Sequence, residues 1–468
     1  MIRRIRRRLP ALLAAAAVLP LALGTPSHSV NAKALYGGGA GTAGAVPITH
    51  VVIIFQENHS FDNLFGLFCR NHPNRQGGCD GVTYGFRSDG TRIPLRQPGD
   101  IVPNVAHDPP AQFASMNHRK MNGFDKITGC GPNLNYACYT QYRRDQSPSL
   151  FSLASRYAIS DHTFEQSPAA SWPAHLQIAA ATTDGFTGFN PVPATDHAPE
   201  KGWGCDSFNV AQWKSPEGAL RTVPACVPGI KDGKKFGPYK PSPVKWVVTI
   251  MDRLWAAHRS WRIYAPAIDN EQEYGYAWAV CPSFADCLYT TQKKALVQND
   301  KIIEDAQNGD LRNFSIVIPK VPDSQHNTRS MIQGDNWVAK VVNAIGNGPD
   351  WDSTAIFVTY DDCGCFYDHM PPPQGKGMGI RVSMVIVSPY AKPAFTDSQV
   401  ANYPSMLAYT ESVFGLSPLG PADANAYDFR NSFDYTQEPL GYQTLPLHTV
   451  PAKSLRYVAE HPGLNPDD

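Results

Sequence analysis

The chain has 468 residues, which is enough for a large hydrophobic core, and its 41 basic residues balance 41 acidic ones. A charged fraction of only 18% without net charge argues against a protein that binds nucleic acid through a basic face. The hydrophobic fraction of 42% and aromatic fraction of 11% exclude a disordered chain, because such a composition buries enough apolar surface to offset the chain entropy.

Residues 1–34 carry the pattern of a secretory signal peptide. Five arginines precede an apolar segment that runs from Leu9 to Leu23, and small residues follow it. The apolar segment is shorter than the roughly 20 residues that a membrane-spanning helix needs, so a cleaved signal is favoured over an uncleaved anchor. The mature chain would have 35 basic and 41 acidic residues. We therefore expect a secreted or periplasmic protein with no transmembrane anchor after signal cleavage.

All ten cysteines follow this segment, and an even number in an exported protein predicts disulfide bonds. Spacing does not settle the connectivity, but pairing of sequence neighbours is favoured. A zinc site is disfavoured, since no C-x-x-C spacing occurs. The least certain pair is the last, because a loop with one intervening residue strains the bridge. The predicted pairs are Cys69–Cys79, Cys130–Cys138, Cys205–Cys226, Cys281–Cys287 and Cys363–Cys365.

Four apolar segments rich in β-branched residues predict buried strands, at residues 50–55, 314–318, 354–360 and 382–387. None of them alternates apolar with polar residues. This pattern is typical of a sheet covered on both faces, so the predicted fold is α/β, with a mostly parallel sheet and helices on both sides. Helical patterns at residues 337–345 and 405–414 alternate with the strands.

Two regions lack this alternation. Residues 185–245 are rich in Gly, Pro and Trp with little periodicity, and we interpret them as a long loop-rich insertion rather than a second domain. The segment after about Leu416 is rich in Pro and Tyr, and we expect it to wrap the surface.

Acidic and amide side chains follow two of the predicted strands. Glu57 and Asn58 come after the first strand, and Asp361 and Asp362 come after the third. Because ligands of such sheets bind beyond the carboxyl ends of the strands, these side chains are expected to form an oxygen-rich site for a divalent cation. The alternative is local: Asn58 could open a helix, and the two aspartates could end a strand in a turn.

Ser171 is the candidate nucleophile. It stands directly before a helical pattern, with Trp172 and Pro173 in the first turn. Free amides at a helix N-terminus favour an anion such as phosphate, and a nearby cation would lower the pKa of the hydroxyl. The alternative is an ordinary N-cap ahead of a proline. Among the histidines of interest, His369 has the strongest independent claim, because it follows Asp361 on the same loop.

These residues carry a resemblance to a known family. Residues 57–66 (ENHSFDNLFG) and 359–372 (TYDDCGCFYDHMPP) resemble two signatures of the bacterial phosphoesterase family that holds phosphatidylcholine-type phospholipases C and acid phosphatases. Residues 379–390, Ser405 and residues 411–416 are similar to its C-terminal part. The similarity implies an alkaline-phosphatase-like catalytic domain at residues 48–418, with 419–468 as a C-terminal tail packed on it.

The resemblance also implies residue roles. Glu57, Asn58, Asp361 and Asp362 match the metal ligands of the family, and Ser171 falls at the position of its nucleophile. Three histidines match active-site positions that bind phosphate oxygens and protonate the leaving group; they are His107, His326 and His369. Cys365, Asn327 and His59 depart from the common pattern, but none of these departures removes a proposed ligand.

The leading interpretation is therefore a secreted, metal-dependent phosphoesterase of phospholipase C type. An acid phosphatase acting on monoesters is the second, and a non-catalytic binding protein on the same scaffold is the third. The expected partner is a phosphate ester, with phospholipids among the candidates, and not a nucleic acid. Ca²⁺, Mg²⁺, Mn²⁺ and Zn²⁺ all stay open as the cation. The sequence indicates no oligomeric state.

Overall fold

The structure is a computed structural model that describes residues 46–197, 202–267 and 275–461. The predicted signal peptide lies outside these ranges. From Val46 onward, the chain belongs to one compact unit.

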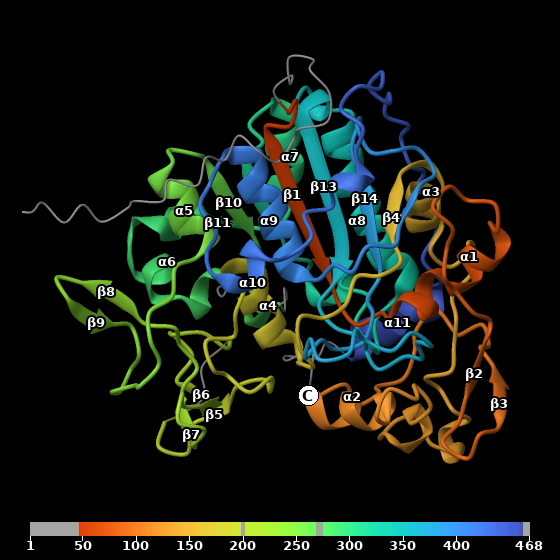
Figure 1. The fold of residues 1–468 in the computed structure, drawn as a ribbon, viewed down its shortest axis with the longest axis horizontal. Helices are drawn as coiled ribbons and strands as arrows, with labels where there is room; N and C mark the ends of the chain where they lie inside the picture. The colour runs from red at the N-terminus through yellow and green to blue at the C-terminus, as the bar shows by residue number, and fades with distance from the viewer. Residues whose placement is uncertain (1–45, 198–201, 268–274, 462–468) are drawn as a thin grey trace, which may run out of the picture. The chain divides into compact units, whose positions relative to one another are not determined.

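A central eight-stranded sheet organises this unit (Figure 1). β14 runs antiparallel to both of its neighbours, and all other adjacent strands are parallel. In sheet order the strands are β11 (Leu296–Val297), β10 (Trp261–Tyr264), β12 (Phe314–Val317), β1 (His50–Gln56), β13 (Thr354–Tyr360), β14 (Met384–Val387), β4 (Ala158–Ser160) and β15 (Thr396–Asp397).

The predicted α/β fold with a mostly parallel sheet is confirmed. Every residue of β12, β13 and β14 is buried, as the continuous apolar segments predict. Of the four predicted segments, the one at β14 runs antiparallel to its neighbours, which a mostly parallel sheet allows. The loop of residues 361–383 brings the chain back into the sheet from the end where β13 stops, so β14 runs in the opposite direction.

Two groups of helices cover the sheet. α7 (Lys301–Asn308) and α8 (Met331–Gly346) contact each other, and α3 (Pro148–Arg156) packs on α8. α4 (Ser171–Ala180) contacts both α5 (Ile250–Ala256) and α9 (Tyr403–Phe414). α7 connects β11 to β12 and α8 connects β12 to β13, and both connections move along the sheet in the same direction. The path from β4 through α4 to β10 moves in the opposite direction. Because crossovers between parallel strands are right-handed, the two groups of helices lie on opposite faces of the sheet (Figure 1).

Capping residues explain why two helices begin earlier than predicted. The Ser330 hydroxyl accepts a hydrogen bond from the Gln333 amide at the start of α8. Asn402 precedes α9, and Pro404 occupies its first turn. Ser330 satisfies an amide that lacks a partner within the helix, and Pro404 is compatible with a first turn because it has no amide to satisfy, so α8 and α9 each extend beyond their apolar pattern toward the N-terminus.

The insertion contains more regular structure than the sequence indicates. It forms two small antiparallel sheets between longer loops, so the predicted loop-rich insertion is confirmed. The strands are short and lack a long periodic pattern, so the sequence does not indicate them. They are β5 (Val192–Pro193), β6 (Asn209–Lys214), β7 (Leu220–Pro224), β8 (Gly229–Lys231) and β9 (Lys234–Phe236).

Four of the five predicted disulfides are present. They join Cys69–Cys79, Cys130–Cys138, Cys205–Cys226 and Cys281–Cys287. The fifth prediction is wrong: Cys363 and Cys365 are buried thiols with their sulfur atoms 3.3 Å apart. With a single residue between them, the backbone cannot easily reach a relaxed bridge.

The remaining elements complete the described chain. Phe429 and Phe433, from the C-terminal segment, pack against Phe357 of the central sheet. Within the described ranges, no helix combines the length and the apolar character that crossing a bilayer requires. The other elements are α1 (Leu67–Asn71), α2 (Pro109–Met116), α6 (Ala285–Tyr289), α10 (Pro421–Ala424), α11 (Ala452–Glu460), β2 (Tyr84–Phe86) and β3 (Arg92–Pro94).

Candidate active site

The structure brings together the polar residues that follow β1 and β13. β1 and β13 are adjacent and parallel, with Gln56 opposite Tyr360, so the residues after each strand share one sheet edge. The Asp361 amide donates to the Gln56 carbonyl (2.9 Å). The Asp361 carboxylate, through Oδ1, accepts hydrogen bonds from the amides of Asn58 (3.0 Å) and Asp362 (2.8 Å). This network fixes both turns relative to each other.

The side chains of Asn58 and Asp361 carry polar atoms that take no part in this hydrogen-bond network. Asp361 Oδ2 and the side-chain oxygen and nitrogen of Asn58 are buried and have no hydrogen-bond partner among the described residues. Asn58 also has a left-handed backbone, with φ of 68°. Gly364 packs so closely that an added Cβ would lie 2.3 Å from the Asn58 carbonyl oxygen. Because burial without a partner costs free energy, these oxygens fit a ligand that they coordinate.

Ser171 faces the same group. It is the first residue of α4, and the preceding Ala170 occupies the N-cap position. The Ser171 hydroxyl donates to Glu57 Oε2 over 3.2 Å, and both side chains are fully buried. The Trp172 amide of the same helix end donates to the Asn190 side chain (2.8 Å). The alternative of an ordinary serine N-cap is therefore wrong.

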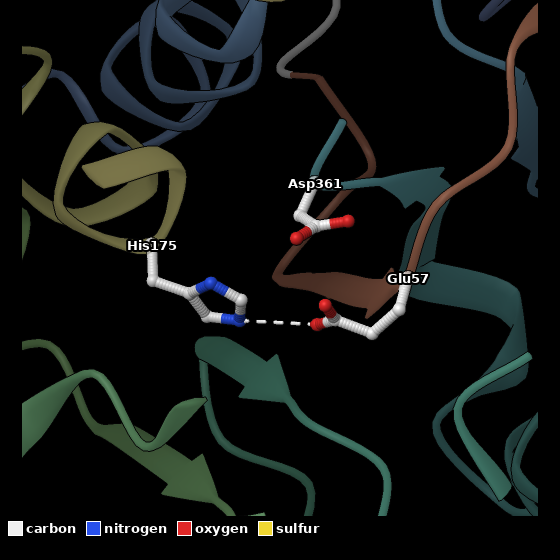
Figure 2. A group of neighbouring side chains, drawn as sticks. All are labelled: Glu57, His175 and Asp361. Atoms are coloured by element: carbon white, nitrogen blue, oxygen red, sulfur yellow. Dashed lines mark ion pairs between the residues drawn. The ribbon is translucent and has the colours of Figure 1, made fainter. Parts of the chain in front are cut away.

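His175 also belongs to this group, although the sequence did not indicate it as a site residue. Its Nε2 lies 3.6 Å from Glu57 Oε1, and Figure 2 shows the two side chains facing each other beside Asp361. One ligand atom from each of Glu57, His175 and Asp361 lies within 4.8 Å of the others. The available signal was the spacing of Ser171 and His175, since residues four apart share a helix face.

Two of the predicted histidines lie together. The rings of His107 and His326 are 5.6 Å apart between centroids, in an edge-to-face arrangement. His107 lines a pocket of about 590 Å³ with Ala170 and Asn190, which places the pocket beside the helix end that carries Ser171. The His326 loop is held close to Glu57, because the Glu57 amide donates to the Ser324 carbonyl (3.1 Å).

His369 belongs to a second acidic group with Asp62 and Asp368. Its Nδ1 lies 2.5 Å from Asp62, and its Nε2 lies 3.2 Å from Asp80. Burial opposes the charged ring, but the hydrogen bonds to Asp62 and Asp80 outweigh burial and raise the pKa of His369 to about 10. The contacts found for His369 therefore differ from those of Ser171 and Glu57.

Glu165 is a further residue that the sequence did not single out. Its carboxylate accepts a hydrogen bond from the Cys363 amide (3.0 Å), directly behind Asp362. Burial, together with Cys363 and Asp362, raises the pKa of Glu165 well above its ordinary value. Burial and the neighbouring Cys365 likewise raise the pKa of the Cys363 thiol, which makes it a poor nucleophile. Glu165 and the Cys363 thiol each accept a hydrogen bond from a backbone amide of the turn that follows Asp362.

A family model with the description "Phosphoesterase family" matches residues 48–417. The chain belongs to this family. It is a hydrolase that acts on phosphoric esters, and the alternative of a non-catalytic binding protein is therefore not supported. The matched segment includes all eight predicted site residues.

Curated relatives point in the same direction. "Phospholipase C A" of Mycobacterium tuberculosis is 23% identical over 86% of this chain and 80% of its own length. "Non-specific phospholipase C6" of Arabidopsis thaliana is 22% identical over 84% of this chain and 73% of its own length. "Non-hemolytic phospholipase C" of Pseudomonas aeruginosa is 24% identical over 79% of this chain and 54% of its own length.

Solved structures give a more distant likeness. A protein in the alkaline phosphatase superfamily from Vibrio parahaemolyticus matches with a TM-score of 0.35 and 12% identity, over 81% of this chain and 69% of that one. Human ectonucleotide pyrophosphatase/phosphodiesterase 5 matches with a TM-score of 0.35 and 8% identity, over 62% of this chain and 94% of that one.

Proposed function

We propose that this protein is a secreted, metal-dependent phosphoesterase of phospholipase C type with Ser171 as its nucleophile. The observation that carries the proposal is the placement of the Ser171 hydroxyl. It lies at the N-terminus of α4 and 3.2 Å from Glu57, beside the buried oxygens of Asn58 and Asp361.

The proposed ligands of the cation are Glu57, Asn58, Asp361 and Asp362. They fit a divalent cation, because the group is rich in carboxylate and amide oxygens and because Asn58 and Asp361 keep buried oxygens without partners in the described chain. Bound there, a cation would offset the charge of the phosphoryl oxygens and lower the pKa of the serine hydroxyl.

The chain's own residues then supply the remaining steps. Ser171 Oγ attacks phosphorus and the P–O bond to the leaving alcohol breaks, while His107 or His326 donates a proton to the departing oxygen. Water next attacks the phosphoserine, which releases the phosphomonoester and restores the Ser171 hydroxyl. Ser171 is the first residue of α4, and the partial positive charge at a helix N-terminus favours the negative charge that develops on the phosphoryl oxygens.

The insertion supports a lipid substrate rather than a small soluble monoester. β6 contributes Val210, Ala211 and Gln212 to the wall of the pocket beside Ser171. In the same insertion Leu220 is 66% exposed. Residues 209–246 contain seven Lys and Arg against two Asp and Glu, in contrast to the acidic mature chain. Exposed apolar side chains within a basic segment are typical of surfaces that contact anionic bilayers.

Export is supported by the disulfides and by the N-terminal pattern. Four bridges persist only in an oxidising compartment. This is consistent with the secretory signal predicted at residues 1–34.

The test uses the purified protein with two substrates, phosphatidylcholine in vesicles and an aryl phosphate monoester, each with and without EDTA. We expect chelator-sensitive release of diacylglycerol and phosphocholine, and loss of this release in Ser171→Ala. Release of inorganic phosphate from the monoester alone would favour the acid phosphatase. Hydrolysis that neither EDTA nor the Ser171→Ala substitution reduces would contradict the proposed metal site and nucleophile.

A further inference from the structure

His175 lies one helical turn after Ser171 on α4. In a helix, residues four apart project from the same face, so the helix presents both side chains to Glu57. The Ser171 hydroxyl reaches Glu57 Oε2, and His175 Nε2 faces Glu57 Oε1. Figure 2 shows the imidazole nitrogen facing the Glu57 carboxylate, with Asp361 beside the pair.

The backbone determines which nitrogen of this ring carries hydrogen. His175 Nδ1 lies 2.7 Å from the Ser171 carbonyl oxygen, which can only accept a hydrogen bond. Nδ1 therefore donates, and in a neutral ring Nε2 presents a lone pair. Histidines that bind metals commonly use this arrangement, in which a carbonyl holds one nitrogen and leaves the other for the metal.

The lone pair of Nε2 then faces a carboxylate oxygen at 3.6 Å, which is longer than a hydrogen bond. His175 is 2% exposed, and Glu57 and Asp361 are fully buried. The Phe55 ring meets the imidazole edge to face with 4.9 Å between centroids, which restricts its orientation. The ligand atoms of Glu57, His175 and Asp361 lie within 4.8 Å of one another, so one divalent cation can contact a carboxylate oxygen and this imidazole nitrogen at the same time.

We infer that His175 supplies a nitrogen ligand to the same divalent cation that Glu57 and Asp361 bind, and that the site selects a later transition-type cation such as Zn²⁺ or Co²⁺ over Ca²⁺ and Mg²⁺. Imidazole suits these cations, while Ca²⁺ and Mg²⁺ take oxygen ligands almost exclusively. The inference rests on the metal site of the proposed function and adds a ligand to it.

Metal binding itself provides the readout. The wild-type protein is stripped with chelator and titrated with Zn²⁺, Co²⁺ and Mg²⁺ by isothermal titration calorimetry, and Co²⁺ binding is also followed by visible absorption. We expect His175→Gln to weaken Zn²⁺ and Co²⁺ binding by about 100-fold and to alter the Co²⁺ spectrum. Mg²⁺ binding should change by less than about threefold.

His72→Gln is the matched control. His72 Nδ1 lies 2.8 Å from the Phe68 carbonyl oxygen, the same spacing of four residues, but the residue is exposed, its ring packs on Phe68, and it belongs to neither acidic group. We expect this variant to bind all three cations as the wild type does. His175→Asn serves as a second variant, and circular dichroism checks that each one folds.

A wild-type measurement keeps the inference testable if neither variant folds. In ¹⁵N-histidine NMR spectra of the wild-type protein, addition of Zn²⁺ should shift one nitrogen that Mg²⁺ leaves unchanged. No such shift would overturn the inference, as would equal Zn²⁺ affinity in wild type and His175→Gln, which would identify a simple ion pair. Failure of the proposed function itself would give a different result. The wild type would then bind no cation, and its hydrolysis would be insensitive to chelator.

Discussion

Two buried acidic groups lie near the same edge of the sheet, and they satisfy their charges in different ways. The second group contains Asp62 and Asp368 and is built around Arg381, which is fully buried. Arg381 Nε lies 3.1 Å from both oxygens of Asp368, and its Nη2 lies 3.5 Å from Asp62. Backbone amides fill the other positions, since Val82 donates to Asp62 and Met370 donates to Asp368.

The Glu57 group lacks this internal balance. Asp361 accepts two backbone amide hydrogen bonds on one oxygen, but its other oxygen and the side-chain oxygen and nitrogen of Asn58 have no hydrogen-bond partner among the described residues. The contrast teaches that acidic clustering alone does not identify a metal site. The group whose charges an arginine already compensates supports the fold, and the group with unused buried oxygens is the one suited to a ligand.

The largest expected effect is on turnover. Ser171→Ala should lower kcat by about 10⁴-fold, because it removes the attacking oxygen, and it should leave the free energy of unfolding within about 1 kcal/mol. Ser167→Ala is the matched control: its hydroxyl accepts a hydrogen bond from the Gln177 side chain (2.8 Å) on the same helix. Steady-state kinetics on the preferred substrate should show less than a threefold change in the control. A similar loss in both variants would point to the helix and not to the nucleophile.

The next effect is on stability and belongs to the second group. Arg381→Met should lower the free energy of unfolding by about 3 to 5 kcal/mol, because it leaves two buried carboxylates without their cation. Arg430→Met is the comparison, since Arg430 also pairs with an aspartate, Asp428, but is 47% exposed. Denaturant unfolding should show less than about 1 kcal/mol for Arg430→Met. Equal small losses would mean that Arg381 does not hold this group together.

A smaller, pH-dependent effect is expected at His369. Its pKa is raised to about 10 against an ordinary value of 6.5, so the charged ring stabilises the folded state. This contribution is complete below pH 6.5 and disappears as the pH rises toward 10. Wild type and His369→Gln should therefore differ by about 2 kcal/mol in unfolding free energy near pH 6 and converge only as the pH passes about 10. A difference that stays constant with pH would contradict the charged assignment.

The sequence predicts the centre of this fold better than its edges. The segments at β1 and β13 are long, apolar and β-branched, so their burial follows from composition. β11 and β15 have two residues each, too few for any period to show. The direction of β14 depends on the path of the preceding loop, which a local pattern does not contain.

In the candidate site, too, some residues could be predicted from the sequence and others could not. Glu57 and Asp361 end recognisable strands, so their approach could be predicted from the topology. His175 was missed: its spacing from Ser171 was the one signal, and its contact with Glu57 joins a helix to a strand end that lies more than a hundred residues away in the chain. The unbridged state of Cys363 likewise depends on the local backbone and not on the number of cysteines.

The smallest expected effect has the opposite sign from that of Arg381. In metal-free protein, Asp361→Asn should raise the free energy of unfolding by about 1 kcal/mol, because it removes one of the like charges clustered at the turn, a change typical of active-site residues. The amide oxygen can still accept from the amides of Asn58 and Asp362. Asp368→Asn is the matched substitution in the second group, and it should lower stability because it removes the partner of Arg381. Thermal unfolding in EDTA measures both, and destabilisation by both variants would show that the two acidic groups serve the fold alike.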